Sequence, residues 1–312
     1  ITHDECKRVL HDMGRERELK RLVILQTNMR GVGGSSGGHR LPEWSKLDSV
    51  FQGLKDGKCD IACLSETKIK ATHIKALRNR YRKLCEQHPK IHYRLSIPAE
   101  GARRGSMIMW REDIPYSSPR VLAQDETNRS VVMEFYGSNG HKLRVASGYF
   151  ENRSKPGWRE QEGSFYRFHG SYVPNPNATN AHKHLYVMTG DLNVVLQPDK
   201  HRLPPRTHEE EDNECIRNHM RDHHLVEAVA HAYPDEEIYT HIVDRKETAE
   251  ADREEDAPEM TQHSKAKLSH ILVNDAALAI CTSAGWTERN PIFAGADHGL
   301  CYIALDITST KY

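Results

Sequence analysis

The sequence lacks any long hydrophobic run, and this absence argues against a membrane-spanning protein. Of its 312 residues, 37% are hydrophobic and 28% are charged. No apolar stretch approaches the roughly 18 residues that a transmembrane helix needs, so we expect no membrane partner. The length allows one large domain or two ordinary ones, with enough chain to build a substantial core.

Cysteine is present, but without the spacing of a disulfide framework. The seven cysteines are an odd number at irregular intervals. Cys59, Cys63 and Cys301 stand in strand-like runs, where a free thiol behaves as a small hydrophobe. This usage argues against a disulfide-stabilised secreted fold and predicts a reduced, intracellular protein.

Two common ligand-binding signatures are also missing. The Gly/Ser-rich stretch GVGGSSGG at 31–38 is not followed by the Lys-Ser/Thr pair of a Walker loop, and we interpret it as a flexible loop. Among 20 histidines, His219 and His223 are four residues apart on a predicted helix. The segment RNHMRDHHL that contains them offers no cysteine partner, so a polar helix face explains this pair better than a zinc site.

Charge is unevenly distributed in a chain whose formal net charge is zero. Residues 1–120 contain 24 Lys and Arg against 14 Asp and Glu, whereas residues 208–260 contain 5 against 18. The basic first third can attract a polyanion, and the acidic block repels one. Within that block we predict a solvated acidic loop near 244–263.

Apolar periodicity predicts strands and helices in alternation. Strands are expected at 21–28, 59–66, 91–97, 105–111, 129–136, 142–150, 185–191, 238–241, 268–273 and 300–307, and helices near 44–54, 74–84, 158–169 and 212–224. This order predicts an α/β protein, a sandwich of two packed sheets flanked by helices. We expect an N-terminal helical extension over 1–19 and a single domain over 20–312.

Polar side chains stand at the ends of four predicted strands. They are Asn28 after the first strand, Glu66 after the second, Asp191 and Asn193 after the strand at 185–191, and Asp297 and His298 before the last strand. Each of these residues alone is explained by ordinary strand termination. Polar groups that end several strands of one sheet can instead converge on a single crevice.

The chemistry of these groups fits the cleavage of a phosphate ester. Glu66 and Asp297 are hard oxygen ligands suited to Mg²⁺, with Mn²⁺ as the alternative. Asp191 can hold and deprotonate an attacking water.

The remaining strand-end groups suit the phosphate itself. Asn28 and Asn193 can donate hydrogen bonds to phosphate oxygens, and His298 can stabilise the charge that builds on phosphorus. Together these roles describe metal-assisted hydrolysis of a phosphate ester.

Six segments resemble the endonuclease/exonuclease/phosphatase (DNase I-like) superfamily, in its order and over roughly residues 20–308: LQTNMRG, LSETKI, GYFEN, TGDLN, KLSHILV and ADHGL. The resemblance implies a two-sheet α/β sandwich with one metal-dependent site. Within the superfamily the chain most resembles endonuclease domains of LINE-type (non-LTR) retrotransposons, through TNMRG, SETKI and YTH followed by LSHILV. That likeness implies a magnesium-dependent enzyme that nicks DNA. It also implies a monomer that acts in the nucleus, with a reverse transcriptase domain in a longer parent chain.

The resemblance assigns the strand-end residues the roles given above and adds others. Tyr149 contacts the scissile phosphate, and Thr240 lies beside it. Arg30 stands where apurinic endonucleases carry Asp, and an arginine cannot bind a metal. We therefore assign Arg30 to substrate binding. Its presence also argues against abasic-site repair as the main role. Arg103 and Arg104 precede a strand in EGARRGS, where they are either solvated or phosphate contacts.

Two departures from the family pattern weaken the implied site. Ser269 stands where the family has an Asp beside the catalytic histidine, and a serine brings no charge to orient the imidazole. Ala296 replaces the usual Ser before Asp-His. One alternative is therefore a weakened relative that binds nucleic acid or protein without cleaving. A phosphatase of the same fold is another, although the Trp-Cys-Asp-Arg segment of lipid and inositol phosphatases is absent.

Overall fold

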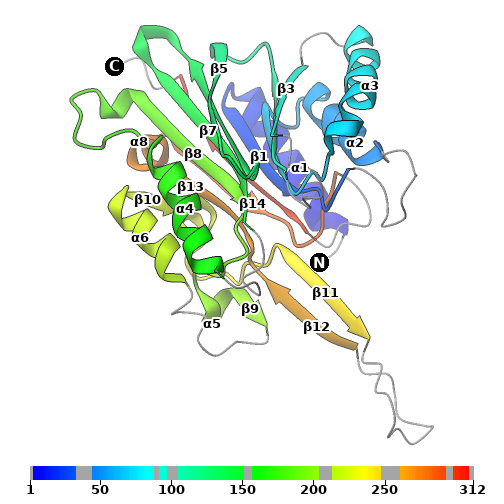
Figure 1. The fold of residues 1–312 in the computed structure, drawn as a ribbon, viewed down its shortest axis with the longest axis vertical. Coiled ribbons are helices and arrows are strands. Elements are labelled where there is room, and N and C mark those ends of the chain that lie inside the picture. The colour runs from blue at the N-terminus through cyan, green and yellow to red at the C-terminus, as the bar shows by residue number, and fades with distance from the viewer. Residues whose placement is uncertain are drawn as a thin grey trace, which may run out of the picture.

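Two six-stranded mixed sheets pack face to face, with helices on their outer faces (Figure 1). The structure is a computed structural model, and it describes residues 3–32, 44–87, 91–96, 105–150, 157–203, 213–246, 261–292 and 298–308. The arrangement confirms the predicted α/β sandwich.

The first sheet has the strand order β14-β15-β1-β2-β4-β3. Its strands are β1 (Leu22–Asn28), β2 (Ile61–Ser65), β3 (Ile91–Leu95), β4 (Met107–Arg111), β14 (Cys281–Trp286) and β15 (Leu300–Leu305). Only β1 and β2 pair in parallel, with Asn28 opposite Ser65 at their carboxyl ends.

The second sheet has the order β10-β13-β8-β7-β6-β5. Its strands are β5 (Ser117–Gln124), β6 (Ser130–Tyr136), β7 (Lys142–Tyr149), β8 (His184–Asp191), β10 (Leu225–Glu227) and β13 (Ser269–Asn274). Here only β7 and β8 run parallel, with Tyr149 opposite Asp191 at their carboxyl ends. Each sheet thus has one central parallel pair that finishes in polar side chains.

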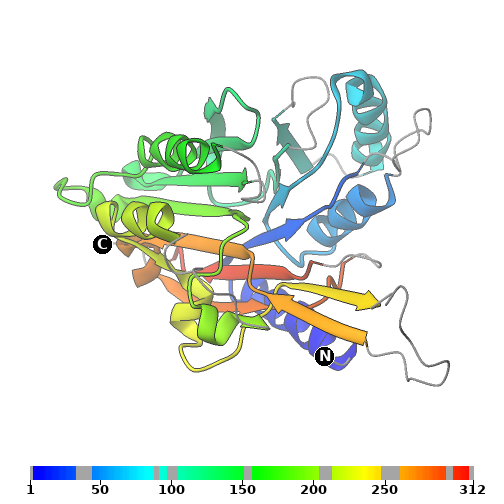
Figure 2. The same cartoon turned by 60° about the horizontal axis from the view of Figure 1, so that its bottom comes forward.

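Helices cover the two outer faces of the sandwich (Figures 1 and 2). The helices are α1 (His3–Glu18), α2 (Ser45–Lys55), α3 (Ile74–Gln87), α4 (Trp158–Gly170), α5 (Pro198–His201), α6 (Glu214–Asp222), α7 (Ala228–Ala232) and α8 (Asp275–Ala279). The first three pack on the first sheet and α4 and α6 on the second. In the segment expected as an N-terminal extension, Val9 and Met13 of α1 are buried with the residues of α2. Of the helices described, none has the length and apolarity that crossing a membrane requires.

The layer between the sheets changes from apolar to polar along the strands. Inward-facing side chains run Leu22, Ile24, Gln26 and Asn28 along β1, and Leu185, Val187, Thr189 and Asp191 along β8. The apolar members form the central core, where burying each such side chain contributes about 1.5–3 kcal/mol. The polar members come last, so hydrogen-bonding groups are buried at one end of the sandwich.

A third, smaller sheet extends from the body in the order β11-β12-β9 (Figures 1 and 2). Its strands are β11 (His241–Lys246), β12 (Thr261–Ala266) and β9 (Arg202–Leu203). The sequence prediction was wrong on two boundaries here. The strand expected at 238–241 begins only at its last residue, and both ends of the expected acidic loop at 244–263 are strands. The centre of that loop, 247–260, lies outside the described residues.

Candidate active site

Asp191 lies at the end of β8, and its carboxylate joins the two sheets. The side chain of Asn28 on β1 donates through Nδ2 to Asp191 Oδ2 at 2.5 Å, and the backbone N–H of Asn193 donates to Oδ1 at 3.1 Å. Asn28 is fully buried and Asp191 is 2% exposed. Residues far apart in the chain therefore meet at the position where both central strand pairs end.

The orientation of the Asn28 amide follows from its second hydrogen bond. Its Oδ1 accepts from the backbone N–H of Arg30 at 2.7 Å. Because the oxygen is engaged there, Nδ2 must be the atom that faces Asp191. The Asn28 amide is therefore fixed at both ends, and it presents a donor to the carboxylate.

His298 precedes β15 and approaches the same carboxylate. Its Nε2 lies 3.9 Å from Asp191 Oδ2, and the side chain is 6% exposed. The backbone of His298 bridges to that of His241, and their ring centroids are 4.3 Å apart. The neighbouring Gly299 N–H donates to the carbonyl of Thr240 at 2.8 Å. The backbone at Thr240 and His241 therefore holds His298 in place.

Thr240 and Ser269 are both buried beside this group. Thr240 Oγ1 accepts from the backbone N–H groups of Leu268 and Ser269, each at 3.0 Å, which leaves the hydroxyl proton as its donor. Ser269 begins β13 directly opposite Asp191. Its Oγ is buried and has no hydrogen-bond partner within the described part of the chain.

Three of the predicted site residues adopt left-handed backbone conformations, with φ of 45° at Arg30, 53° at Glu66 and 49° at Asn193. Non-glycine residues rarely adopt this region, and observed strain of this kind is enriched at functional sites. Each follows a strand end, where the chain must turn abruptly. The strain is consistent with side chains that the turns aim at one place.

Glu66, the predicted metal ligand, immediately follows β2. Its Oε1 lies 2.6 Å from Nζ of Lys68, and the side chain is 14% exposed. The carboxylate therefore already holds a cation in this structure. Among the described residues, no cluster of three or more His, Cys, Asp or Glu is suited to a metal.

The other predicted residues lie around Asp191 or outside the described chain. Tyr149 is half-buried opposite Asp191, and Asn193 donates through Nδ2 to the carbonyl of Phe150 at 2.6 Å. Arg30 is exposed. The residues outside the described chain are Asp297, Ala296, Arg103 and Arg104.

Sequence reasoning missed a polar layer directly beneath the strand ends. Ser147 on β7 donates to the carbonyl of Leu64 on β2 at 3.2 Å and so ties the two sheets together. Gln26 donates to Ser65 at 3.5 Å, while its buried Oε1 has no partner among the described atoms. The signal was available along β1, β7 and β8, because the position two residues before each of these strand ends is already polar: Gln26, Ser147 and Thr189.

Comparison with solved structures identifies the fold. The chain matches the AP endonuclease of Leishmania major with a TM-score of 0.65 and 14% identity, over 98% of this chain and 99% of that one. It matches the endonuclease domain of TRAS1, a telomere-specific non-LTR retrotransposon, with a TM-score of 0.58 and 12% identity, over 92% and 99%. For the 3′–5′ exonuclease of Neisseria meningitidis the values are 0.60 and 17%, over 91% and 100%. The fold is that of the DNase I-like superfamily.

This result confirms the fold that the sequence resemblance implied. At the level of sequence, no family model and no curated protein matches the chain. The DNase I-like fold is therefore recognisable here from its three-dimensional arrangement and from short motifs at the strand ends. The structural neighbours are described as an AP endonuclease, a retrotransposon endonuclease domain and a 3′–5′ exonuclease.

Proposed function

We propose that this protein is a metal-dependent phosphodiesterase that nicks DNA in the manner of a LINE-type retrotransposon endonuclease. The observation that carries the proposal is the buried Asp191 carboxylate, held by Asn28 at 2.5 Å with His298 Nε2 at 3.9 Å. A base, a fixed amide and an imidazole within a few ångströms are groups that can promote hydrolysis of a phosphodiester.

Asp191 is the proposed base for the attacking water. Asn28 and the backbone N–H of Asn193 hold its two oxygens from different directions, so the carboxylate does not need to reorganise when water binds. Such positioning lowers the barrier because the orientation is established before the reaction. The proton of the water goes to Asp191 as its oxygen attacks phosphorus, the P–O bond to the leaving sugar oxygen breaks, and that oxygen takes up a proton from solvent.

The phosphate is proposed to bind over the strand ends. Asn28 and Asn193 each use one amide N–H within the protein, which leaves the second N–H for a phosphate oxygen. The Tyr149 hydroxyl and the exposed Arg30 add donors at the rim. His298 is proposed to stabilise the negative charge that develops on the phosphate in the transition state.

Glu66, with Asp297, is proposed to hold Mg²⁺ or alternatively Mn²⁺. Mg²⁺ is usually held by one or two carboxylates together with waters and substrate phosphate. A half-buried carboxylate such as Glu66 is therefore enough protein ligand for this ion, and a full cage of protein ligands is not needed. The Lys68 ammonium at 2.6 Å marks the oxygen as a cation site and must move aside. When bound, the ion supplies Lewis-acid polarisation of the phosphate.

DNA is proposed as the substrate because the first third of the chain is basic and because a structural neighbour was solved with DNA. The first 120 residues carry an excess of Lys and Arg, which favours a polyanion. A Neisseria 3′ phosphatase with TM-score 0.61 and 16% identity was solved with a product DNA hairpin. The retrotransposon likeness extends the proposal to a monomer that acts on nuclear DNA and precedes a reverse transcriptase in a longer chain.

The test is nicking of supercoiled plasmid with Mg²⁺, with Mn²⁺ and with EDTA, for the protein and for Asp191→Asn. We expect nicked circles with metal, none with EDTA and almost none with the variant. The uncharged Ser269 favours a second candidate, a relative that binds DNA without cleaving it. DNA binding without nicking under all metals would establish that candidate and overturn the first. Release of phosphate from a 3′-phosphorylated oligonucleotide, without nicking, would point to a phosphatase.

A further inference from the structure

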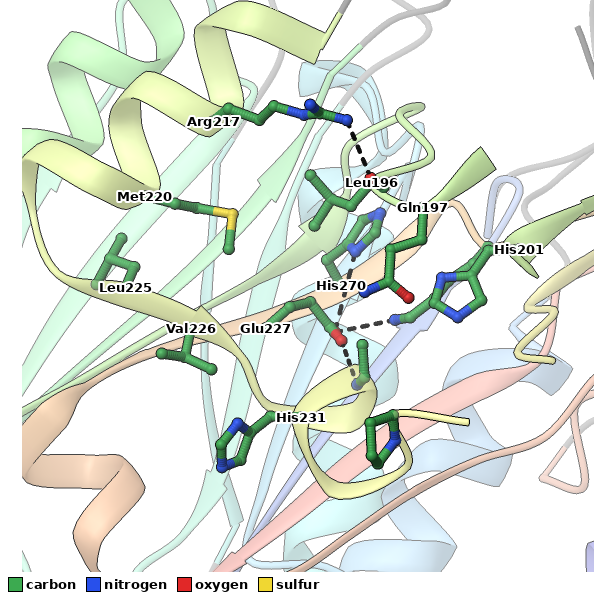
Figure 3. A pocket seen from close by; sticks show the side chains of 13 residues that line it. Leu196, Gln197, His201, Arg217, Met220, Leu225, Val226, Glu227, His231 and His270 are labelled. Atoms are coloured by element: carbon green, nitrogen blue, oxygen red, sulfur yellow. Dashed lines mark hydrogen bonds and ion pairs between the residues drawn. The ribbon is translucent and has the colours of Figure 1, made fainter. Parts of the chain in front are cut away.

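A cavity of about 510 Å³ lies beside α6 and α7, and none of its lining residues belongs to the candidate active site (Figure 3). Its size is within the range of small-molecule sites. Met220 and Arg217 of α6 form one side, with Leu225 and Val226 of β10 beneath them. The cavity therefore combines apolar walls with an exposed cation at its rim.

The floor of the cavity is a fully buried ion pair. Glu227 Oε1 accepts from Lys267 Nζ at 2.9 Å and from the Ile271 N–H at 3.2 Å, and Oε2 accepts from the Ala230 N–H at 2.6 Å. Burial alone would raise the pKa of Glu227, but the Lys267 charge holds it below its ordinary value. The pair is neutral overall. Lys267 also donates to the carbonyl of Ser269 at 3.1 Å, so one of its three N–H groups remains for another acceptor.

His270 adds an acceptor to this floor. Its Nε2 donates to the carbonyl of Val194 at 2.9 Å. Burial and the nearby Lys267 lower the pKa of His270 to about 3, so the ring is neutral and Nδ1 carries a lone pair. Nδ1 has no hydrogen-bond partner among the described residues and lies 3.9 Å from Glu227 Oε1. Two acceptors that face each other at this distance are well placed to share one donor from a ligand.

His201 completes the polar lining. It is 1% exposed, and neither ring nitrogen has a hydrogen-bond partner among the described residues. Burial and Lys267 lower the pKa of His201 to about 4. A neutral imidazole offers one donor and one acceptor. Buried polar atoms without partners are rare in folded proteins, and they indicate a missing partner.

We propose that this cavity binds a free mononucleotide, with its base on the floor and its phosphate at Arg217. The base is a neutral, flat ring with adjacent donors and acceptors, which matches the neutral floor made by Glu227, Lys267 and the two histidines. The apolar faces of the ring fit against Leu225 and Met220.

Two other ligand classes fit less well. A metal ion would need ligands that can surround it, and the described residues contain no such cluster. A bare anion would find no net charge on the floor, because Glu227 neutralises Lys267. The exposed Arg217 guanidinium makes only a long hydrogen bond of 3.4 Å to the carbonyl of Leu196, so it can turn toward a phosphate.

The experiment is calorimetric titration in EDTA with four probes: AMP, CMP, adenosine and ribose 5-phosphate. We expect the two nucleotides to bind, adenosine to bind more weakly, and ribose 5-phosphate not to bind. His201→Phe keeps the packing but removes both nitrogens, and it should weaken nucleotide binding about tenfold or more, the equivalent of one lost buried hydrogen bond. Arg217→Gln should weaken the binding of AMP but leave the binding of adenosine unchanged. Arg221→Gln, one turn further along α6, is the matched control and should bind AMP normally.

Two further variants separate this cavity from the candidate active site. Val226→Trp should fill the cavity and abolish binding, and it replaces His201→Phe if that variant does not fold. Asp191→Asn should bind AMP like the unaltered protein. Any of three results would overturn the proposal. They are full AMP affinity in Val226→Trp, loss of AMP affinity in Asp191→Asn, and the absence of binding heat with both AMP and CMP. None of these readouts depends on nicking.

Discussion

Two buried carboxylates flank the same strand, β13, and their surroundings differ. Asp191 on β8 lies opposite Ser269, and Glu227 on β10 lies opposite Leu272. They are 2% and 5% exposed. Glu227 has an ammonium at 2.9 Å, whereas Asp191 receives a carboxamide at 2.5 Å and has an imidazole 3.9 Å away. Nearly equal burial therefore accompanies two different kinds of partner.

The difference indicates different roles for the two acids. A carboxylate in contact with a permanent cation and two backbone N–H groups is stabilised as an anion, and it is a poor base. The Asp191 carboxylate meets a carboxamide, a backbone N–H and an imidazole, and no Lys or Arg ammonium or guanidinium is described against it. This difference supports the proposal that Glu227 serves the fold and its adjoining cavity, whereas Asp191 serves the chemistry.

Removing the cation from the Glu227 pair should cause the largest loss of stability. Lys267→Met leaves a buried charge without compensation, which costs about 3–5 kcal/mol of the free energy of unfolding. Urea unfolding at pH 7 measures this loss. Lys200→Met is the control, because Lys200 pairs with the exposed Asp235 at 3.7 Å, and exposed pairs contribute roughly 0–1 kcal/mol. Equal losses in the two variants would show that the Glu227 pair does not stabilise the fold.

Removing the other carboxylate should affect activity. Asp191→Ala is expected to reduce plasmid nicking at least about a hundredfold, because it removes the proposed base. Glu66→Ala and His298→Ala should each reduce it about as much, through the proposed metal site and charge stabilisation. Asp222→Ala, an exposed acid at the end of α6, is the control and should nick normally. Near-normal nicking in any two of the three site variants, with normal melting curves, would refute the site assignment.

The same comparison shows what could be predicted from the sequence. Asn28, Asp191 and His298 could be brought together because each terminates or precedes a strand in a recognisable motif. Glu227 and Lys267 could not, since they are 40 residues apart. Lys267 opens the KLSHILV motif, but Glu227 stands in none. Their contact depends on how β10 packs beside β13.

The strands that were not expected from the sequence are β5, β9, β10, β12 and β14. Two of them, β5 and β14, were missed for related reasons. The sequence of β5, SSPRVLAQ, has irregular alternation, and its pairing with β6 contains register shifts. The sequence of β14, CTSAGW, is made mostly of small residues and also pairs through a shift. Both are edge strands, where one neighbour is missing and the apolar pattern is correspondingly weak. The interior strands had stronger signals.

Part of the pH dependence of stability should come from His270, on the Glu227 side of β13. The pKa of His270 is about 3 in the folded protein, below its ordinary value, so the unfolded chain takes up the proton first as pH falls. The free energy of unfolding that depends on neutral His270 is present in full above about pH 6.5, and it is lost as the pH falls from there to about pH 3. His270→Gln should therefore flatten the slope by up to about 1.4 kcal/mol per pH unit between pH 6 and 4. Parallel urea-unfolding slopes for the two proteins would contradict this origin.

The smallest expected effect concerns Ser269, which faces Asp191 across the strand pair. Its buried Oγ, with no partner among the described residues, is where the family carries a carboxylate. Ser269→Asp would place a negative charge near the imidazole that approaches Asp191, and so favour its charged, oriented form. We expect nicking to rise about tenfold, the low end of what such supporting groups contribute at metal sites.

The new charge also has a cost, because residues directly opposite on paired strands have Cβ atoms about 4.5–5.5 Å apart and like charges there repel. Ser269→Asp should therefore melt at a lower temperature than the unaltered protein while nicking faster. Ser269→Asn separates the two effects, since it matches the shape of Asp without its charge and should leave the nicking rate near its starting value. Rates for all three proteins across pH 6 to 9 at saturating Mg²⁺ provide the measurement. If Ser269→Asp is folded and no faster than Ser269→Asn at every pH, a carboxylate at this position does not act on His298, and the serine is no weakness of the site.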